Sequence, residues 1–406
     1  MKFYFPDSQD LVSPTYDFVN DEYSPFRVRQ RDDRYAHEVL ETPPYDGLLV
    51  SKAVVDGSVR GTGRYSMPQR QRIYRMGVRD FFRLPESTVT MGDCGSFTYA
   101  DEPEPPYSVA EVLDFYEECG FDAGVSVDHV ILGYSKLGKA SDDWIRRQQT
   151  TLECAQAYLD EGLSRKTSVE PVGAAQGWDP ESYADSVAEL QKMGYLRIAL
   201  GGMIALKTPD ILDCLAAIDD VRHKNVSLHL LGISRIESFD AFKSHGVTSF
   251  DSTSVFRQAF MDDRDNYHTV SSTFAAIRVP QVEGNVSVKR AILSGRLRQS
   301  EAKAAEKDAL RALREYDAGR VTAAVALDSV LAYERLVIGP KRKTYAEHYE
   351  RTLECAPWRE CSCGLCEYHG IEIAVFRGTE RNKRRGFHNL ATLRAKIARK
   401  LEGVGR

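Results

Sequence analysis

Three aspartates stand at positions where acid–base or nucleophilic chemistry is possible. Asp93, Asp128 and Asp251 each follow a short run of apolar or β-branched residues. A lone aspartate at such a point is more often a loop or helix cap. Three equivalent ones favour a reactive site, because substitution with retention at a glycosidic carbon needs two carboxylates, one to attack the carbon and one to transfer a proton.

Two other short apolar runs end in groups that could hold a flat ligand. Gln176 follows Gly-Ala-Ala, and the pair Gly201 and Gly202 follows Ile-Ala-Leu. Glycine has no side chain, so the backbone N–H groups of this pair can approach a planar ligand closely. The sequence therefore predicts carboxylates, an amide and exposed backbone around one site.

A cysteine cluster near the C-terminus has the spacing of metal ligands. The chain has eight cysteines, of which three lie within six positions: Cys361, Cys363 and Cys366. With His388 they would form a closed tetrahedral zinc site, which is typical of structural zinc that anchors a helix. A chain of 406 residues does not need disulfides for stability, and reduced free cysteines are the alternative. Cys355 and His369 are alternative ligands.

The same region is strongly basic although the chain has a formal net charge of −5. Between Arg377 and Lys400 nine Lys or Arg residues stand against the single acid Glu380. Such a patch could bind a phosphate backbone, whereas the alternative is a solvated helix face. The backbone contacts expected from it are Arg381, Lys383, Arg384 and Arg385.

Alternating strands and helices position these residues between about Tyr45 and Val282. Eight strands are predicted, at Gly47–Val55, Thr88–Met91, Ala123–Val127, Ser168–Ala174, Leu196–Leu200, Val226–Leu230, Val247–Phe250 and Thr273–Val279. Amphipathic helices are expected at Ser108–Cys119, Asp142–Glu161, Pro180–Met193, Pro209–His223 and Ser234–His245. Eight strand–helix units favour an α/β protein with a (β/α)8 TIM-type barrel over a doubly wound sheet.

The predicted barrel covers residues 45–286, after an N-terminal extension at 1–44 and before a mainly helical, zinc-containing region at 287–406. In that last region the expected buried positions are Leu293, Leu297, Leu310 and Leu313. Its expected helices include Val321–Leu336, Tyr345–Leu353 and Leu390–Leu401, and the last begins just after His388. The sequence shows neither a signal peptide nor a membrane span, so a cytoplasmic location is expected.

Several of these motifs together resemble those of tRNA-guanine transglycosylases. They are Asp93-Cys-Gly-Ser-Phe, Ala175-Gln-Gly, Leu200-Gly-Gly, Ser249-Phe-Asp251 and Cys-x-Cys-x-x-Cys with His388-Asn389. The resemblance runs from about Tyr45 to Leu401. It implies base exchange without backbone cleavage, in which an aspartate displaces guanine to form a covalent ester and a 7-deazaguanine then attacks that ester.

The resemblance also implies a role for each site residue. Asp251 resembles the nucleophile, and Asp93 resembles the general acid/base that protonates the departing guanine. Six residues would bind the base: Asp128, Gln176, Gly201, Gly202, Met203 and Phe97. Asp128 would accept hydrogen bonds from the N–H edge of a purine, while Gln176 and the backbone of Gly202 would donate to its carbonyl oxygen.

Departures from the family pattern favour DNA as the substrate. The tRNA enzymes usually read Asp-Ser-Gly-Gly/Ala-Phe/Tyr-Gln where this chain has Asp93-Cys-Gly-Ser-Phe-Thr98. The chain looks more like the DpdA branch, whose members insert preQ0 into DNA. The stretch Gly202-Met203-Ile-Ala lacks the Gly-Glu with which bacterial enzymes meet an aminomethyl group, which favours an uncharged nitrile base.

The leading hypothesis is thus a DNA-guanine transglycosylase with a structural zinc ion and preQ0 as substrate. Its partners would be DNA, the 7-deazaguanine base and companion proteins of a DNA-modification system. One alternative is a tRNA-guanine transglycosylase that uses the same aspartates. Another is a non-catalytic barrel subunit that binds nucleic acid. A general glycoside hydrolase would need neither the zinc site nor the basic segment.

Overall fold

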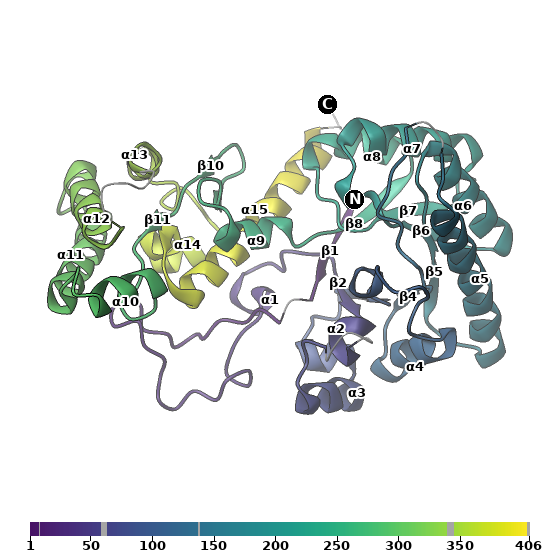
Figure 1. Ribbon diagram of the computed structural model, residues 1–406, viewed down its shortest axis with the longest axis horizontal. Helices are drawn as coiled ribbons and strands as arrows, with labels where there is room; N and C mark the ends of the chain where they lie inside the picture. The colour runs from purple at the N-terminus through teal and green to yellow at the C-terminus, as the bar shows by residue number, and fades with distance from the viewer. Residues whose placement is uncertain (8, 58–62, 137–138, 339–344, 404–406) are drawn as a thin grey trace. The chain divides into compact units, whose positions relative to one another are not determined.

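The computed structural model describes residues 1–7, 9–57, 63–136, 139–338 and 345–403 (Figure 1). The chain forms two compact units. The first, the barrel unit, comprises Met1–Ser8 and Tyr45–Thr253, and the second unit comprises Gln9–Pro44 and Ser254–Arg406. The predicted boundary between residues 44 and 45 coincides with a boundary between these units, whereas the units separate after Thr253 and not after residue 286.

Eight parallel strands close a barrel in the order in which they follow one another along the chain. They are β1 (Lys2–Pro6), β2 (Gly47–Ser51), β3 (Val89–Asp93), β4 (Ala123–Val125), β5 (Glu170–Ala175), β6 (Arg197–Leu200), β7 (Ser227–Leu230) and β8 (Val247–Asp251). The intervening helices are α2 (Lys52–Asp56), α3 (Met67–Phe82), α4 (Val109–Cys119), α5 (Asp142–Arg165), α6 (Pro180–Met193), α7 (Thr208–Val221) and α8 (Phe239–Ser244) (Figure 1). The predicted (β/α)8 fold is confirmed.

One predicted strand was wrong. The segment Thr273–Val279 lies outside the barrel and contains two two-residue strands, β10 (Thr273–Phe274) and β11 (Ile277–Arg278). The remaining barrel strand is β1, which pairs with β2 on one side and β8 on the other. The first residues of the chain are therefore part of the barrel. A five-residue strand gives little periodicity, and its partners lie more than 40 positions away in sequence.

The barrel interior is filled by side chains of alternating size. Tyr4, Leu49 and Met91 pack against small residues such as Ala123 and Ala199, all nearly or fully buried. Each large apolar side chain removed from water stabilises the fold by about 1.5–3 kcal/mol. The barrel is thus a packed core, and ligands must bind at its ends.

Local capping fixes the helices that carry the rim loops. Ser108 caps α4, as expected, because its Oγ accepts a hydrogen bond from the backbone N–H of Glu111 at 3.2 Å. Helix α6 begins with Asp179 as its cap and Pro180 in its first turn, and it ends at Gly194 with φ +114°. Both helices therefore begin and end within one residue of the predicted positions.

The second unit is mainly helical, as expected. Its elements are α1 (Ala36–Val39), α9 (Ser254–Met261), β9 (Tyr267–His268), β10, β11, α10 (Val286–Leu293), α11 (Gln299–Asp317), α12 (Ala323–Ile338), α13 (Ala346–Cys355), α14 (Leu365–His369), β12 (Val375–Phe376) and α15 (Gly378–Gly403). Two expectations fail here. Leu293 is 87% exposed, because it lies on the outer face of α10. Helix α15 starts twelve positions before Leu390, so His388 lies within it.

No helix in the described part of the chain is long and apolar enough to cross a membrane.

Candidate active site and metal centre

The sequence-predicted site residues meet at one end of the barrel. Asp93 and Asp251 are the last residues of β3 and β8, and Gln176 follows β5 directly. Asp128 lies three positions beyond β4, and Gly201 follows β6. Because all eight strands are parallel, their carboxyl ends form a single rim, which is where (β/α)8 enzymes place their chemistry.

Asp128 is the centre of a buried hydrogen-bond network. Its Oδ1 accepts from the Cys94 thiol at 3.0 Å, and its Oδ2 accepts from Ser96 Oγ at 3.1 Å and from Gln176 Nε2 at 2.6 Å. Tyr99 donates to Cys94 Sγ at 2.9 Å. Burial raises the pKa of Asp128, whereas the bonds from Cys94 and Gln176 lower it. Burial also raises the pKa of Cys94, which keeps the thiol protonated as a donor.

Asp93 has the properties of a proton-transfer group. Burial, and next the charge of Asp128, raises the pKa of Asp93 to about 6. A 2.8 Å hydrogen bond from Ser51 Oγ to Oδ2 acts in the opposite direction. Asp251 adds a smaller raising contribution, which shows that the three carboxylates share one electrostatic environment. A carboxyl group with this pKa can both give and take a proton near neutrality.

Asp251 is held by two donors on the same oxygen. Its Oδ1 lies 3.0 Å from the backbone N of Gly232 and 3.2 Å from His229 Nε2. An ionised carboxylate can only accept, so Nε2 must carry the proton. Burial lowers the pKa of His229, which keeps the ring neutral. Its Nδ1 is then an acceptor for the hydroxyl of Ser249, 2.8 Å away.

Sequence reasoning missed His229 and Ser249. They are register partners on β7 and β8, and both are buried. The available signal was a polar residue inside each of two neighbouring apolar strands, Ser227-Leu-His-Leu230 and Val247-Thr-Ser-Phe250. Only the strand register shows that the two polar residues meet below Asp251.

The glycine pair after β6 lies against Gln176 at the same rim. A Cβ on Gly201 would lie 2.2 Å from Gln176 Nε2, and one on Gly202 would lie 2.4 Å from the carbonyl oxygen of Ile131. Gly202 also has φ +74°, which disfavours any larger residue. These glycines keep Gln176 in contact with Asp128.

The last two predicted base-binding residues differ in exposure. Phe97 lies on the 3-10 turn Ser96–Tyr99 and is 50% exposed, so its ring is accessible for stacking. Met203 begins the 3-10 turn Met203–Ala205 and is fully buried. Phe97 can thus contact a ligand directly, whereas Met203 supports the turn after the glycine pair.

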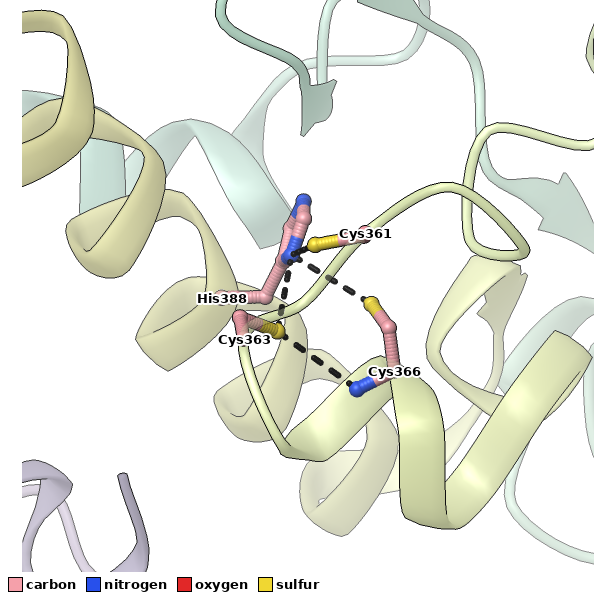
Figure 2. A group of neighbouring side chains, drawn as sticks. All are labelled: Cys361, Cys363, Cys366 and His388. Atoms are coloured by element: carbon pink, nitrogen blue, oxygen red, sulfur yellow. Dashed lines mark hydrogen bonds between the residues drawn. The ribbon is translucent and has the colours of Figure 1, made fainter. Parts of the chain in front are cut away.

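The predicted cysteine cluster converges with His388 in the second unit (Figure 2). His388 Nδ1 lies 3.5 Å from the sulfur of Cys361 and 3.4 Å from those of Cys363 and Cys366. With metal–sulfur and metal–nitrogen bonds of about 2.3 and 2.0 Å, a tetrahedral site requires a nitrogen–sulfur spacing of about 3.5 Å. The group therefore has the geometry to hold a metal ion.

Neighbouring groups orient the imidazole toward the sulfurs. His388 Nε2 lies 2.7 Å from the carbonyl oxygen of His268, so Nε2 donates and Nδ1 is left as the ligand atom. The ring of Tyr267 stacks on His388 with centroids 4.2 Å apart. The alternative ligands Cys355 and His369 both lie outside this group. Cys355 is also exposed.

The expected phosphate contacts on α15 are mostly inside the protein. Arg381 is fully buried and bonds to Asp21 and Glu372. Arg385, also fully buried, donates to the carbonyl oxygens of Ala259 and Val375. Both guanidinium groups form their hydrogen bonds and ion pairs with other parts of the protein. They cannot reach a phosphate, and the prediction was wrong for them.

The other two predicted phosphate contacts, Arg384 and Lys383, also form ion pairs within the protein. Arg384 is 2% exposed, pairs with Glu380 and donates to the carbonyl oxygen of Ser13 at 2.6 Å. The prediction was wrong for Arg384 too. Lys383 has a side chain that is 23% exposed and pairs with Asp10 at 3.1 Å. The four cations predicted to contact phosphate are thus paired or bonded within the second unit.

The barrel, its three rim carboxylates and the Cys3His group have the arrangement expected for the tRNA-guanine transglycosylase superfamily. No protein-family model matches the chain. A DNA-guanine transglycosylase of Salmonella montevideo is 48% identical over 400 residues, which cover 97% of this chain and 95% of that protein. The chain therefore belongs to the DNA-guanine transglycosylase family and is an enzyme of the transglycosylase type.

Proposed function

We propose that this enzyme exchanges a guanine in DNA for preQ0 through a covalent aspartyl-deoxyribose intermediate. The observation that carries the proposal is the pairing, at one rim, of a carboxyl group with a raised pKa and a carboxylate fixed by two N–H donors. The 48% identity to a DNA-guanine transglycosylase supports DNA as the polymer.

In the first half-reaction, Asp251 attacks C1′ of the flipped deoxyguanosine. The bond from C1′ to N9 breaks, and the base takes a proton from Asp93 as it leaves as neutral guanine. An ester bond now joins Asp251 to the deoxyribose, and the DNA backbone stays intact. The hydrogen bonds from His229 and Gly232 fix Oδ1 of Asp251, so that Oδ2 is the attacking atom.

In the second half-reaction, the incoming base replaces guanine in the same place. Asp93, now ionised, accepts the N9 proton of the 7-deazaguanine, whose nitrogen attacks C1′ while the ester bond to Asp251 breaks. Two inversions give net retention, and both carboxyl groups return to their starting states. The pKa of about 6 suits this alternation, because neither form of Asp93 is strongly favoured near neutrality.

The buried network around Asp128 would recognise the base. Three donors already bond to its oxygens, and the remaining acceptor capacity lies on Oδ1. A guanine-like N–H edge would donate there, and the amide of Gln176 and the backbone N–H of Gly202 would donate to the carbonyl oxygen of the base. The backbone N–H of Gly201 already donates to the carbonyl oxygen of Ala175. Phe97, half-exposed beside them, offers a surface for stacking. The turn after the glycine pair, which Met203 supports, carries no acidic residue, and this fits the uncharged nitrile of preQ0.

The Cys3His group is proposed to hold a structural zinc ion. Three thiolates and one imidazole fill all four tetrahedral positions, which leaves none for substrate. Bound there, zinc would link α14 and its preceding loop to α15 and stabilise the second unit. Chelation should lower the midpoint of thermal unfolding in the wild type but not further in Cys366→Ala. An equal effect of the chelator on both would contradict the assignment.

The test is to incubate the purified protein with preQ0 and either duplex DNA or bulk tRNA, then digest to nucleosides and measure their masses. We expect 7-cyano-7-deazadeoxyguanosine from DNA and no modified nucleoside from tRNA. A product from tRNA alone would overturn the DNA assignment. No product from either would contradict independent catalysis, in favour of a binding subunit or a required companion protein.

A further inference from the structure

A second basic segment, unlike that of α15, lies on the surface of the second unit. Within ten positions the end of α10 and the following turn carry four cations: Lys289, Arg290, Arg296 and Arg298. We call them the basic ridge. No acidic residue occurs between Asn285 and Ser300.

The packing of α10 directs the ridge outward. Val288 and Ala291, three positions apart, are each 2% exposed and form the inner face of the helix, and Leu297 anchors the following turn. Lys289 and Arg290 fall on the opposite face and are exposed. Gly295, with φ +70°, reverses the chain so that the turn carries its two arginines out to solvent as well.

The charges of the ridge are not neutralised locally. Among the described residues, none of the four forms an ion pair or a side-chain hydrogen bond. The acids nearest in sequence are Glu283, which pairs with Lys303, and Glu301 in the first turn of α11. Arg296 also lines a pocket that contains Asp263 and Glu334. The bond from Lys303 lowers the pKa of Glu283, and the charge of Lys289 adds a smaller lowering effect. The ridge therefore retains most of its positive field.

We propose that the basic ridge binds the phosphate backbone of the duplex DNA substrate. This inference rests on the proposed function. A chain with net charge −5 must concentrate positive charge locally to attract a polyanion. Helix α10 has eight residues, so it extends about 12 Å at 1.5 Å per residue, and DNA presents a phosphate about every 1.7 Å of its axis. Several phosphates thus lie within reach, and arginine can bind each of them through two N–H groups.

The experiment compares salt dependence of DNA binding. In the ridge variant all four cations are replaced by alanine. The matched control is Arg311→Ala with Arg320→Ala, two exposed arginines of the same unit whose charges are already paired, with Asp308 and Glu315. Circular dichroism would verify that both fold. The dissociation constant of a labelled duplex is then measured from 50 to 200 mM salt.

We expect the ridge variant to bind DNA more weakly and to lose about 0.9 from the slope of log K against log salt for each phosphate contact removed. The control should keep the wild-type slope. At saturating DNA, the ridge variant should exchange guanine at the wild-type rate, because the ridge is outside the reacting site.

An unchanged slope in the ridge variant, with wild-type exchange intact, would overturn this inference alone and leave the exposed Leu293 and its neighbours as a surface for a protein partner. Failure of the wild type to exchange guanine in DNA would overturn the proposed function and this inference with it. The two failures are therefore distinguishable.

Discussion

Buried charges are treated differently in the two units. At the barrel rim, Asp93 and Asp128 form no ion pair among the described residues, and burial raises the pKa of both. In the second unit, the fully buried Arg381 bonds to Asp21 on one side and Glu372 on the other. Removing one partner of a buried ion pair destabilises the structure, because it leaves the other charge uncompensated. A buried carboxyl group without a counter-charge instead has a raised pKa and is available for proton transfer.

The sharpest test of this contrast is Asp93→Asn. We expect kcat to fall by about 10²–10⁴-fold, because the amide cannot transfer a proton. The free energy of unfolding at pH 7 should be unchanged or higher, because a carboxyl group with a raised pKa is destabilising when ionised. If Asp93→Asn instead lost as much unfolding free energy as a large-to-small substitution in the core, Asp93 would stabilise the fold, and the contrast between the two units would be wrong.

The same variant carries a pH signature. The unfolded chain releases the Asp93 proton near pH 4, and the folded protein releases it at about 6. Between these values the folded state binds more protons, so the contribution of Asp93 to stability falls as the pH rises. Denaturation of the wild type and Asp93→Asn across this window should show that contribution only in the wild type.

In the second unit, Arg381→Met should cost about 3 kcal/mol of unfolding free energy, because the buried Asp21 and Glu372 each lose one of two arginine partners. Asp21 keeps Arg377, and Glu372 keeps Arg314. Urea denaturation measures the loss. The matched control is Arg311→Met, whose exposed pair with Asp308 should contribute nothing measurable. If both variants lost the same small amount of unfolding free energy, the buried ion pairs of Arg381 would not stabilise the second unit.

A smaller effect is expected at His229, which orients Asp251. Replacing it by Phe removes one charge-assisted hydrogen bond, about 1.5–3 kcal/mol, and should lower kcat about 10- to 150-fold with little change in KM. His229→Gln keeps a donor and should retain more activity. Steady-state kinetics would contradict the positioning role if the two variants were equally impaired.

The smallest expected effect is a shift in a pH profile. Ser51 donates to Asp93 and lowers its pKa, so Ser51→Ala should raise it. The descending limb for guanine release, which follows loss of the Asp93 proton, should move to higher pH. Ser249→Ala removes a hydrogen bond to His229 instead and serves as the control. If the descending limb of the pH profile does not move in Ser51→Ala, it does not arise from the loss of the Asp93 proton.

Much of the barrel was predictable from the sequence, because five of its strands are short apolar runs followed by a polar residue or a glycine pair. Asp93, Gln176 and Asp251 were placed at strand ends by that pattern. β1 was not predictable, since a five-residue strand is defined only by its partners β2 and β8. The role of His229 depends in the same way on its register with Ser249.

The two basic segments, on α15 and in the basic ridge, show more clearly what could not be predicted from the sequence. In sequence, the cations of α15 and those of the ridge look alike, and phosphate contacts were predicted only for those of α15. What separates them is the position of acids remote in sequence, such as Asp21, 360 positions from Arg381. No local pattern contains that information, whereas burial and pairing in the fold do.

The most direct test of the central claim is to look for the covalent intermediate. The enzyme is mixed with a duplex oligonucleotide in the absence of any incoming base, and intact mass is measured. The wild type should give an enzyme–DNA adduct lacking one guanine, and Asp251→Asn should give none. An adduct that persists in Asp251→Asn, or guanine exchange in the wild type without any adduct, would contradict Asp251 as the nucleophile.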